Sequence, residues 1–372
     1  MKVAIISRGI PTPKDPVYGI FEFDQAKALA KKGIDVAFIA IDFRSWTVKR
    51  KYGLSQYERE GVHVFELSLP INRYRKTIPL LQRLLLIPFR TMLKTFGKPD
   101  VVHAHFYKIG AIAAILKKKY GIPFVITEHC SEFNKPIDQI NHWDIRSAKK
   151  AYPFCDILIS VSEALRNSIS QNFGHDSIVI PNIVDSQSFN YNGQPKSTSP
   201  FVFVSVGNLI PRKGFDILIE AFAQVKDDAI LYIIGEGHER KNLEEQIQRL
   251  GLQQQVKLLG RLERKEINMV FQKSHVFALP SQLETFGVCY IEAMYAGLPV
   301  IATRCGGPEF FVQESDGILI SVNDHDCLVE AMKKIRNNYE RYNSKQISQS
   351  CIERFSPDVI ADKLTNTYSS LL

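Results

Sequence analysis

Two glutamates, Glu284 and Glu292, stand eight residues apart in the segment SQLETFGVCYIEAMYAGLPVIAT. We expect a helix to begin at about Gly287, which puts Glu284 just before it and Glu292 in its second turn, so both carboxylates can face one ligand. The backbone N–H groups and the positive dipole end of a helix start favour a phosphate or an electron-rich sugar oxygen. Carboxylates accept hydrogen bonds well, which suits the vicinal hydroxyls of a sugar or ribose. The plainer alternative is a capped helix with two solvated glutamates.

Two adjacent cations, Arg212 and Lys213, lie between a strand-like run and an amphipathic helix in VSVGNLIPRKGFDILIEAF. Cations at a helix start oppose the local dipole unless an anion lies between them and the N–H groups. Arginine offers a planar fork to phosphate oxygens and lysine a compact point charge. The pair would hold a diphosphate and stabilise its charge as it leaves; a solvated basic loop is the alternative.

The elements that must position these residues alternate between apolar, strand-like runs and helical patterns along almost the whole chain. Such alternation predicts an α/β protein with parallel sheets covered on both faces. The polar stretch 186–199 is the best linker candidate, so we expect domains at 1–185 and 200–355 that meet at a cleft. Residues 356–372 would form a helix that packs back towards the first domain.

Open α/β sheets bind ligands at the carboxyl ends of their strands. Residues with chemistry at such ends are Gly207, Asn208, Arg261, Ser281, Glu284, His103, His105 and His129. His103 and His105 alternate on one strand and so point to one face. A metal pair there is conceivable, but no third ligand follows at a useful spacing.

Composition and missing motifs exclude several classes of protein. The six cysteines form no C-x-x-C pair, so neither a zinc site nor a disulfide framework is indicated, and a reducing cytoplasm fits. The start of the chain does not read as a signal peptide, and no window is long and apolar enough for a transmembrane helix. GEGHER (235–240) has Arg240 at the third glycine position of a dinucleotide fingerprint, which argues against a nicotinamide cofactor. No G-x-x-x-x-G-K-[ST] is present, which excludes a P-loop ATPase.

The net charge of +8 is concentrated in the first half of the chain, and no acidic residue occurs between Glu66 and Asp100. The cations in this basic stretch are Arg73, Arg75, Lys76, Arg83, Arg90, Lys94 and Lys98. Several of them fall on one helical stripe beside leucine and isoleucine, a pattern that suits an anionic membrane surface. A core helix with a solvated basic outer face is the alternative. A nucleic-acid partner is not favoured, because no recognition motif or aromatic interleaving appears.

These segments together resemble retaining glycosyltransferases of family 4, which have the GT-B fold of two Rossmann-like domains. The resemblance covers nearly the whole chain. It rests on the segments GIFEFDQAKALAKKGIDV, DVVHAHF, VITEH, IPNIVD, VGNLIPRKG and the pair of glutamates eight apart. It implies an N-terminal domain for the acceptor and a C-terminal domain for the nucleotide-sugar donor, acting in cell-surface polysaccharide or glycolipid assembly.

The resemblance also implies roles for individual residues. Arg212 and Lys213 would grip the donor diphosphate, Glu292 the ribose, and Glu284 the transferred sugar, while His129 would lie beside the anomeric carbon. The backbone around Glu284 would help at Thr285, Phe286, Gly287 and Val288. Gly19 matches the first-loop glycine, although Tyr18 replaces the first glycine of the usual pair. The backbone near Arg261 and Leu262 would meet the base, and Glu309 matches a late glutamate without an assigned role.

The mechanism implied is substitution with retained anomeric configuration and without a metal, in which preorganised cations and N–H donors stabilise the leaving diphosphate. The acceptor would be a lipid-linked saccharide at the inner face of the cell membrane, with the protein peripheral there. Two alternatives stay open: a nucleotide-sugar epimerase on the same scaffold, and a catalytically silent, membrane-docked binding protein.

Overall fold

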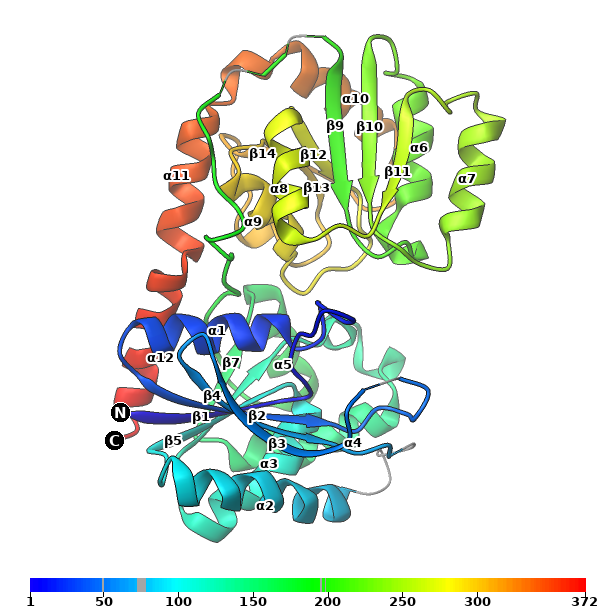
Figure 1. The fold of residues 1–372 in the computed structure, drawn as a ribbon. Helices are drawn as coiled ribbons and strands as arrows, with labels where there is room; N and C mark the ends of the chain where they lie inside the picture. The colour runs from blue at the N-terminus through cyan, green and yellow to red at the C-terminus, as the bar shows by residue number, and fades with distance from the viewer. Residues whose placement is uncertain (49, 72–77, 195, 198) are drawn as a thin grey trace. The chain divides into compact units, whose positions relative to one another are not determined.

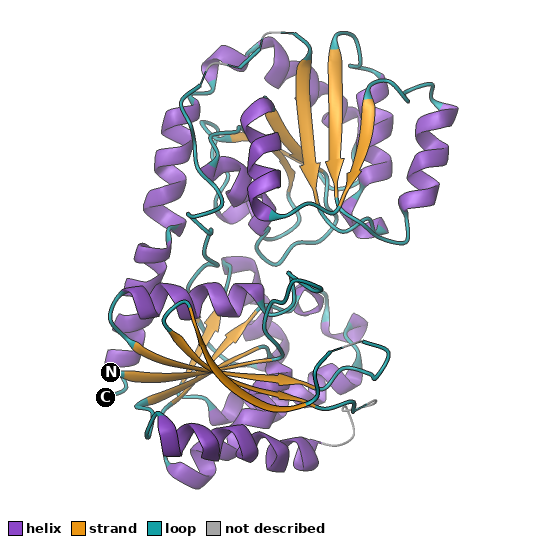
Figure 2. Ribbon diagram, in the orientation of Figure 1, coloured by secondary structure: helices purple, strands orange, loops and turns teal. Residues whose placement is uncertain are grey.

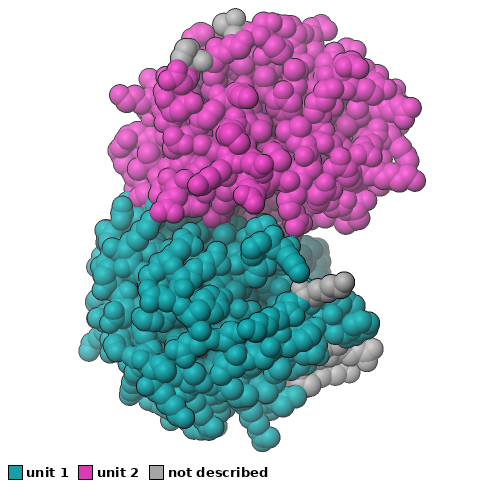
Figure 3. Space-filling view, viewed as in Figure 1, with its two compact units in different colours: residues 1–183, 357–372 teal, residues 184–356 magenta. Residues whose placement is uncertain are grey.

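The computed structural model describes residues 1–48, 50–71, 78–194, 196–197 and 199–372. It divides into two compact units, residues 1–183 with 357–372 and residues 184–356, which Figure 3 shows in different colours. Each unit contains one sheet with helices on its faces (Figure 2). The segment 186–199, expected as a linker, belongs to the second unit, and the helix at the end of the chain belongs to the first.

The sheet of the first unit has the strand order β3-β4-β2-β1-β5-β6-β7-β8. The strands are β1 (Lys2–Ser7), β2 (Asp35–Asp42), β3 (Gly53–Arg59), β4 (Val62–Ser68), β5 (Val101–His105), β6 (Phe124–Glu128), β7 (Ile157–Ser160) and β8 (Ile178–Val179). All paired neighbours are parallel except β3 with β4. β1 and β5 are buried almost along their whole length, because the sheet is covered on both faces.

Helices pack on both faces of this sheet (Figure 1). They are α1 (Ile20–Lys31), α2 (Ile78–Thr95), α3 (Tyr107–Tyr120), α4 (His142–Ala151), α5 (Glu163–Phe173) and α12 (Pro357–Ser369). α1 and α12 pack against each other, and Ile360, Leu364 and Tyr368 of α12 are buried in the same hydrophobic core as Phe23 of α1. The last helix of the chain therefore completes the core of the first unit.

The sheet of the second unit is parallel throughout its described pairs, with the order β11-β10-β9-β12-β13-β14. Its strands are β9 (Phe201–Val206), β10 (Ala229–Ile234), β11 (Val256–Gly260), β12 (Val276–Leu279), β13 (Val300–Thr303) and β14 (Gly317–Ile320). Its helices are α6 (Phe215–Ala223), α7 (Arg240–Arg249), α8 (Arg264–Lys273), α9 (Val288–Tyr295), α10 (His325–Asn337) and α11 (Ser344–Phe355). α6 packs on α10, and α9 on α11.

The expected fold class is confirmed, since each unit is an α/β layer structure built on a sheet whose strands are mostly parallel. The antiparallel strand β3 at the sheet edge was not expected. Its sequence GLSQYER is polar and mostly exposed, so it carries no apolar run of the kind that marks a buried strand.

Candidate functional site

In the second unit, the motif with the two cations lies against the motif with the two glutamates. Arg212 and Lys213 form a short 3-10 turn that ends at Gly214, the residue before α6. Gly214 has φ +68°, and a Cβ there would lie 2.5 Å from the carbonyl oxygen of Pro280, so only glycine fits. In the loop that follows Pro280, the N–H of Gln282 donates to the carbonyl oxygen of Arg212 at 2.8 Å. This backbone contact holds the cationic turn beside the loop that carries Glu284.

Lys213 and Glu284 form a direct ion pair between Nζ and Oε1. The hydroxyl of Ser281 donates to the same carboxylate oxygen at 2.8 Å. Glu284 is only 8% exposed. Burial acts to lower the pKa of Lys213, but the Glu284 carboxylate outweighs it and the pKa is raised, so the lysine is charged at neutral pH. A cation expected to meet phosphate and a carboxylate expected to meet a sugar are thus in contact.

The main chain of Glu284 is fixed on its other side by the loop after β13. Its N–H donates to the carbonyl of Cys305, and its carbonyl accepts from the N–H of Gly307, both at 3.2 Å. α9 then begins at Val288 with Gly287 as its N-cap in the left-handed region, at φ 95° and ψ 59°. The expected position of the helix start agrees with this, and Glu292 lies within α9. The carboxylate therefore sits on a rigid loop directly before a helix N-terminus.

Glu292 is 8% exposed and has a cationic neighbour that the sequence did not reveal. The Nε of Arg264, the first residue of α8, lies 3.8 Å from Oε1 of Glu292. The Nη1 of the same arginine lies 3.5 Å from a carboxylate oxygen of Asp185. Arg264 belongs to none of the sequence motifs, so only the fold shows that it lies beside Glu292. Asp185 is the last residue of the motif IPNIVD, but the motif alone did not suggest a function for it.

The other residues expected on the donor side are placed as follows. Gly207 and Asn208 directly follow β9, and Arg261 and Leu262 directly follow β11. Phe286 is buried, whereas Thr285 and Val288 are partly exposed. Glu309 is exposed, and its carboxylate accepts the N–H of Gly306 at 2.6 Å, which gives it a role in the loop beside Glu284. All these residues belong to the second unit.

His129 and Gly19 belong to the first unit. Gly19 precedes α1 with φ +78°, and a Cβ there would lie 2.3 Å from the carbonyl oxygen of Gly9. The close approach joins the two ends of the loop between β1 and α1. Nearby, the Arg8 guanidinium carbon lies 4.3 Å from the Phe106 ring centroid, and Arg8 Nε lies 3.6 Å from the buried carboxylate of Glu22.

The residues around His129 are organised by Glu128, a buried carboxylate that the sequence motif contains but that had no assigned role. It accepts the N–H groups of His129, Cys130 and Tyr107, each at 2.9 Å. It also accepts the hydroxyl of Tyr152 at 2.9 Å. Burial raises the pKa of Glu128 to about 7, against the lowering effect of these donors. Glu128 therefore fixes the start of the loop after β6 to the start of α3.

Three histidines lie side by side at the carboxyl ends of β5 and β6. Nδ1 of His105 lies 3.0 Å from Nε2 of His129. The ring centroids of His103 and His105 are 4.4 Å apart and nearly parallel, as expected for two side chains on one face. His103 is engaged at both nitrogens, by Tyr368 Oη and Thr127 Oγ1, each at 2.7 Å. Burial lowers the pKa of His103 and His129 to about 3 and that of His105 well below its usual value, so all three rings are neutral at pH 7.

The residue between these histidines and α3 has an unusual backbone. Phe106 has φ 67° and ψ 144°, a region that glycine adopts far more readily than any other residue. This conformation lays its ring 4.9 Å from that of His129, measured between centroids. Its N–H donates to the carbonyl of Thr127 at 2.8 Å, and its own carbonyl accepts from Gly110 at 2.8 Å. The strain is therefore held by hydrogen bonds on both sides.

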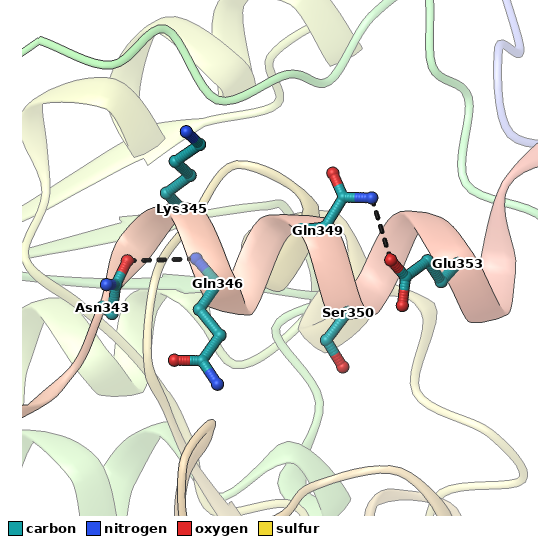
Figure 4. A pocket seen from close by; sticks show the side chains of 6 residues that line it. All are labelled: Asn343, Lys345, Gln346, Gln349, Ser350 and Glu353. Carbon is teal, nitrogen blue, oxygen red and sulfur yellow. Dashed lines mark hydrogen bonds between the residues drawn. The ribbon is translucent and has the colours of Figure 1, made fainter.

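The described residues outside these clusters add no metal-ligand site. No group of three or more His, Cys, Asp or Glu side chains among them could hold a metal ion, and none of their helices is long and apolar enough to cross a membrane. A surface pocket lies along α11 (Figure 4), and its lining includes none of the residues singled out above. Its lining consists of Asn343, Lys345, Gln346, Gln349, Ser350 and Glu353.

Two protein-family models together match most of both units. The model described as glycosyl transferases group 1 matches residues 187–349, and the model described as glycosyltransferase family 4 matches residues 23–188. An uncharacterized glycosyltransferase of Methanocaldococcus jannaschii is 32% identical over 243 residues, which cover 65% of this chain and 66% of that protein. TuaC of Bacillus subtilis, a glycosyltransferase named for teichuronic acid biosynthesis, is 25% identical over 90% of this chain and 89% of its own length.

Solved structures resemble the whole chain at lower identity. Sucrose-phosphate synthase from Thermosynechococcus elongatus superimposes with a TM-score of 0.82 at 19% identity, covering 100% of this chain and 99% of its own. HepE from Anabaena, solved in complex with UDP-glucose, superimposes with a TM-score of 0.75 at 22% identity, covering 100% of both chains. At these identities the likeness establishes the fold.

Proposed function

The chain belongs to the group 1 glycosyl transferases and has the GT-B fold, and from this premise we propose that it moves a sugar from a nucleotide-diphosphate donor to a saccharide acceptor with retention of anomeric configuration. The donor would bind to the second unit and the acceptor to the first. The reaction would proceed without a metal ion. The product would belong to cell-surface polysaccharide or glycolipid assembly, in keeping with the name of the TuaC relative.

The observation that carries the proposal is the ion pair between Lys213 and Glu284 beside the start of α9. A donor diphosphate would bind to Lys213 and Arg212, which replaces the carboxylate as the partner of the lysine. Glu284 would then be released to accept hydrogen bonds from sugar hydroxyls, for which a carboxylate is well suited. Glu292, held by Arg264, would accept the ribose hydroxyls. When the donor binds, the ion pair between Lys213 and Glu284 would thus be replaced by contacts of Lys213 with the diphosphate and of Glu284 with the sugar.

In the reaction, the bond between the anomeric carbon and the diphosphate oxygen breaks while the acceptor oxygen bonds to the same face of that carbon. The proton of the acceptor hydroxyl passes to the departing diphosphate, so no protein base is required. The charge that grows on the leaving oxygen is stabilised by Lys213, Arg212 and the helix N-terminus, in the manner of a preorganised electrostatic site. Glu284 is engaged by Lys213 and Ser281, which suits a binding role more than that of a covalent nucleophile.

A thermal-shift panel tests the donor site. UDP, GDP, ADP and CMP, with the corresponding nucleotide sugars, are each added to the full chain with and without magnesium. One nucleoside diphosphate should raise the melting temperature by several degrees, equally with EDTA, because a ligand that binds only the folded state stabilises it. The same ligand should give no shift with Lys213→Ala. Absence of any shift from all nucleotides would contradict the donor site, and a shift that requires magnesium would contradict the metal-free mechanism.

The acceptor side of the proposal concerns the outer face of α2. Leu80 and Ile87 are 48% and 45% exposed, and they alternate along this helix with the exposed Arg83, Arg90 and Lys94. Their spacing of three or four residues places all five on one stripe. Arg73, Arg75 and Lys76 of the basic stretch lie outside the described residues. An exposed stripe of cations with apolar residues fits the surface of an anionic bilayer, where a lipid-linked acceptor would be reached.

Co-sedimentation with liposomes tests this surface. The chain should bind vesicles that contain phosphatidylglycerol and not vesicles of phosphatidylcholine alone, and binding should fall with added salt. Arg83→Glu with Arg90→Glu should abolish binding, whereas Lys241→Glu with Lys345→Glu, two exposed cations of the other unit, should leave it intact. Equal binding to both kinds of vesicle, or none to either, would exclude the membrane surface.

A further inference from the structure

Arg8, the residue directly after β1, has a guanidinium group that the function proposed above does not use. β1 lies between β2 and β5 inside its sheet, and open α/β sheets bind ligands at the carboxyl ends of their strands. The Nε of Arg8 is buried, whereas the side chain as a whole is 41% exposed. The terminal nitrogens of the guanidinium therefore reach the surface, in the unit proposed to bind the acceptor.

Glu22 is the carboxylate nearest to this cation, but it does not engage the guanidinium as a hydrogen-bonded partner. Nε of Arg8 lies 3.6 Å from Oε1 of Glu22, which is an ion pair but is longer than a hydrogen bond. Among the residues that the structure describes, Nε has no hydrogen-bond partner. Arg44, by contrast, donates from Nε to both carboxylate oxygens of Asp42, at 3.0 and 3.2 Å. An arginine that served only as the counterion of Glu22 would be expected to bind it in that second way.

Two aromatic rings hold the guanidinium in place. Its carbon lies 4.3 Å from the ring centroid of Phe106 and 5.3 Å from that of Tyr18. The ring of Tyr18 also has the guanidinium carbon of Arg44 3.6 Å from its centroid. Arginine stacks on aromatic rings through its flat face, and its N–H groups, which lie in the plane, stay available to a ligand. The rings therefore position the cation without occupying its donors.

The charges around Arg8 favour an anion at its exposed end. Burial lowers the pKa of His129, and the positive charge of Arg8 lowers it further, so this neighbouring ring carries no charge at pH 7. Glu22 is 1% exposed and lies near the buried Nε. An anion that approaches the terminal nitrogens from solvent would thus meet the cation before it meets the carboxylate.

We propose that Arg8 determines the class of acceptor, by binding an oxyanion, a carboxylate or a phosphate, that the acceptor saccharide carries. Glu22 positions the guanidinium from its buried side. The inference deepens the function proposed above and rests on it, because it names the charge of the acceptor. Arginine recognises such oxyanions through paired N–H donors. A neutral saccharide would offer no charge to these donors and would bind less tightly.

Nuclear magnetic resonance of the full chain labelled with nitrogen-15 in arginine tests the site directly. The Nε–H signal of Arg8 is identified by its loss in Arg8→Lys, which keeps a cation beside Glu22. The probes are two pairs of sugars: methyl glucuronide with methyl glucoside, and glucose 6-phosphate with glucose. At least one anionic sugar should shift this signal and bind at least about tenfold more tightly than its neutral counterpart.

Three results of this titration would overturn the proposal. One is that neither anionic sugar shifts the Arg8 signal. Another is that the neutral sugars shift it at the same concentrations as the anionic ones. The third is a shift with a nucleoside diphosphate and with no sugar, which would assign Arg8 to the donor instead of the acceptor.

Two variants separate the binding of an anion from the pairing with Glu22. Arg8→Gln alone would leave a buried carboxylate without its cation, so it is combined with Glu22→Gln, which removes both charges together. The double variant should lose the preference for the anionic sugar, measured by saturation-transfer difference spectra, whereas Glu22→Gln alone should keep it. Lys118→Gln, an exposed cation of the same unit, is the control and should bind like the wild type. An unchanged preference in the double variant would refute the role of Arg8.

Failure of this inference is distinguishable from failure of the proposed function. The thermal-shift panel of nucleotides does not depend on Arg8. A chain that binds a nucleoside diphosphate but shows no preference for anionic sugars would refute only the inference. A chain that binds anionic sugars at Arg8 but no nucleotide would contradict the transferase function, and with it the assignment of the anion to an acceptor.

Discussion

Replacing Glu284 with glutamine should separate the binding of diphosphate from the transfer of sugar. The substitution keeps the shape of the side chain and an oxygen that can accept from Ser281, but it removes the charge that pairs with Lys213. Breaking a fully buried pair by removing one partner costs about 3–5 kcal/mol. The Lys213 and Glu284 side chains are 13% and 11% exposed, so we expect a loss somewhat below this range, about 2–3 kcal/mol in the free energy of unfolding.

The same change should raise the affinity for a nucleoside diphosphate, because Lys213 no longer has to break its ion pair with Glu284 before it binds the phosphate. An increase of about tenfold corresponds to about 1.4 kcal/mol. Isothermal titration calorimetry with the nucleoside diphosphate that stabilises the wild type measures this, and a transfer assay on the same protein should show turnover lost. Glu314→Gln, an exposed carboxylate of the same unit, is the control. If Glu284→Gln weakened diphosphate binding, or left transfer intact, the exchange of partners at Lys213 would be refuted.

Variants of Glu128, Arg264 and Lys213 test three other contacts. Folding raises the pKa of Glu128 from 4.5 to about 7, so its contribution is full below about pH 4.5 and is lost as the pH rises through 7. Denaturant unfolding should therefore show the wild type losing about 3 kcal/mol over this interval relative to Glu128→Gln, and parallel pH profiles would contradict it. Arg264→Leu should weaken the binding of a nucleoside diphosphate but not of pyrophosphate, because Glu292 loses the cation that holds it. Calorimetry with both ligands measures this. Equal weakening of the two ligands would argue against a role of Glu292 in binding the ribose. Lys213→Met should weaken pyrophosphate and nucleoside diphosphate alike, and unchanged pyrophosphate binding would exclude it from the phosphate site.

The fold was predictable because its signals are local. Apolar runs such as those of β1, β5 and β6 are long enough to identify buried parallel strands, and glycine marks the starts of α6 and α9. β3 was missed because an exposed edge strand has no such run. The sequence of α4, HWDIRSAKKA, also gives little signal for a helix, because this helix buries few side chains.

The site could be predicted only residue by residue. Lys213 and Glu284 each stand in a motif, but their ion pair joins positions far apart in the chain and follows from the fold. Arg264 gave no signal, because an arginine in the first turn of a helix resembles any solvated cation until Glu292 and Asp185 are seen beside it. The link between His103 and Tyr368 similarly depends on α12 returning to the first unit.

The backbone conformation of Phe106 limits how far the thermal stability of this enzyme could be raised without loss of activity. A conformation that glycine adopts freely costs a larger residue about 1–3 kcal/mol, so a laboratory selection for thermal resistance alone would favour glycine at position 106. Such a variant would lose the ring that lies between Arg8 and His129. Selection that also demanded turnover should therefore retain phenylalanine there and gain its heat resistance elsewhere in the chain.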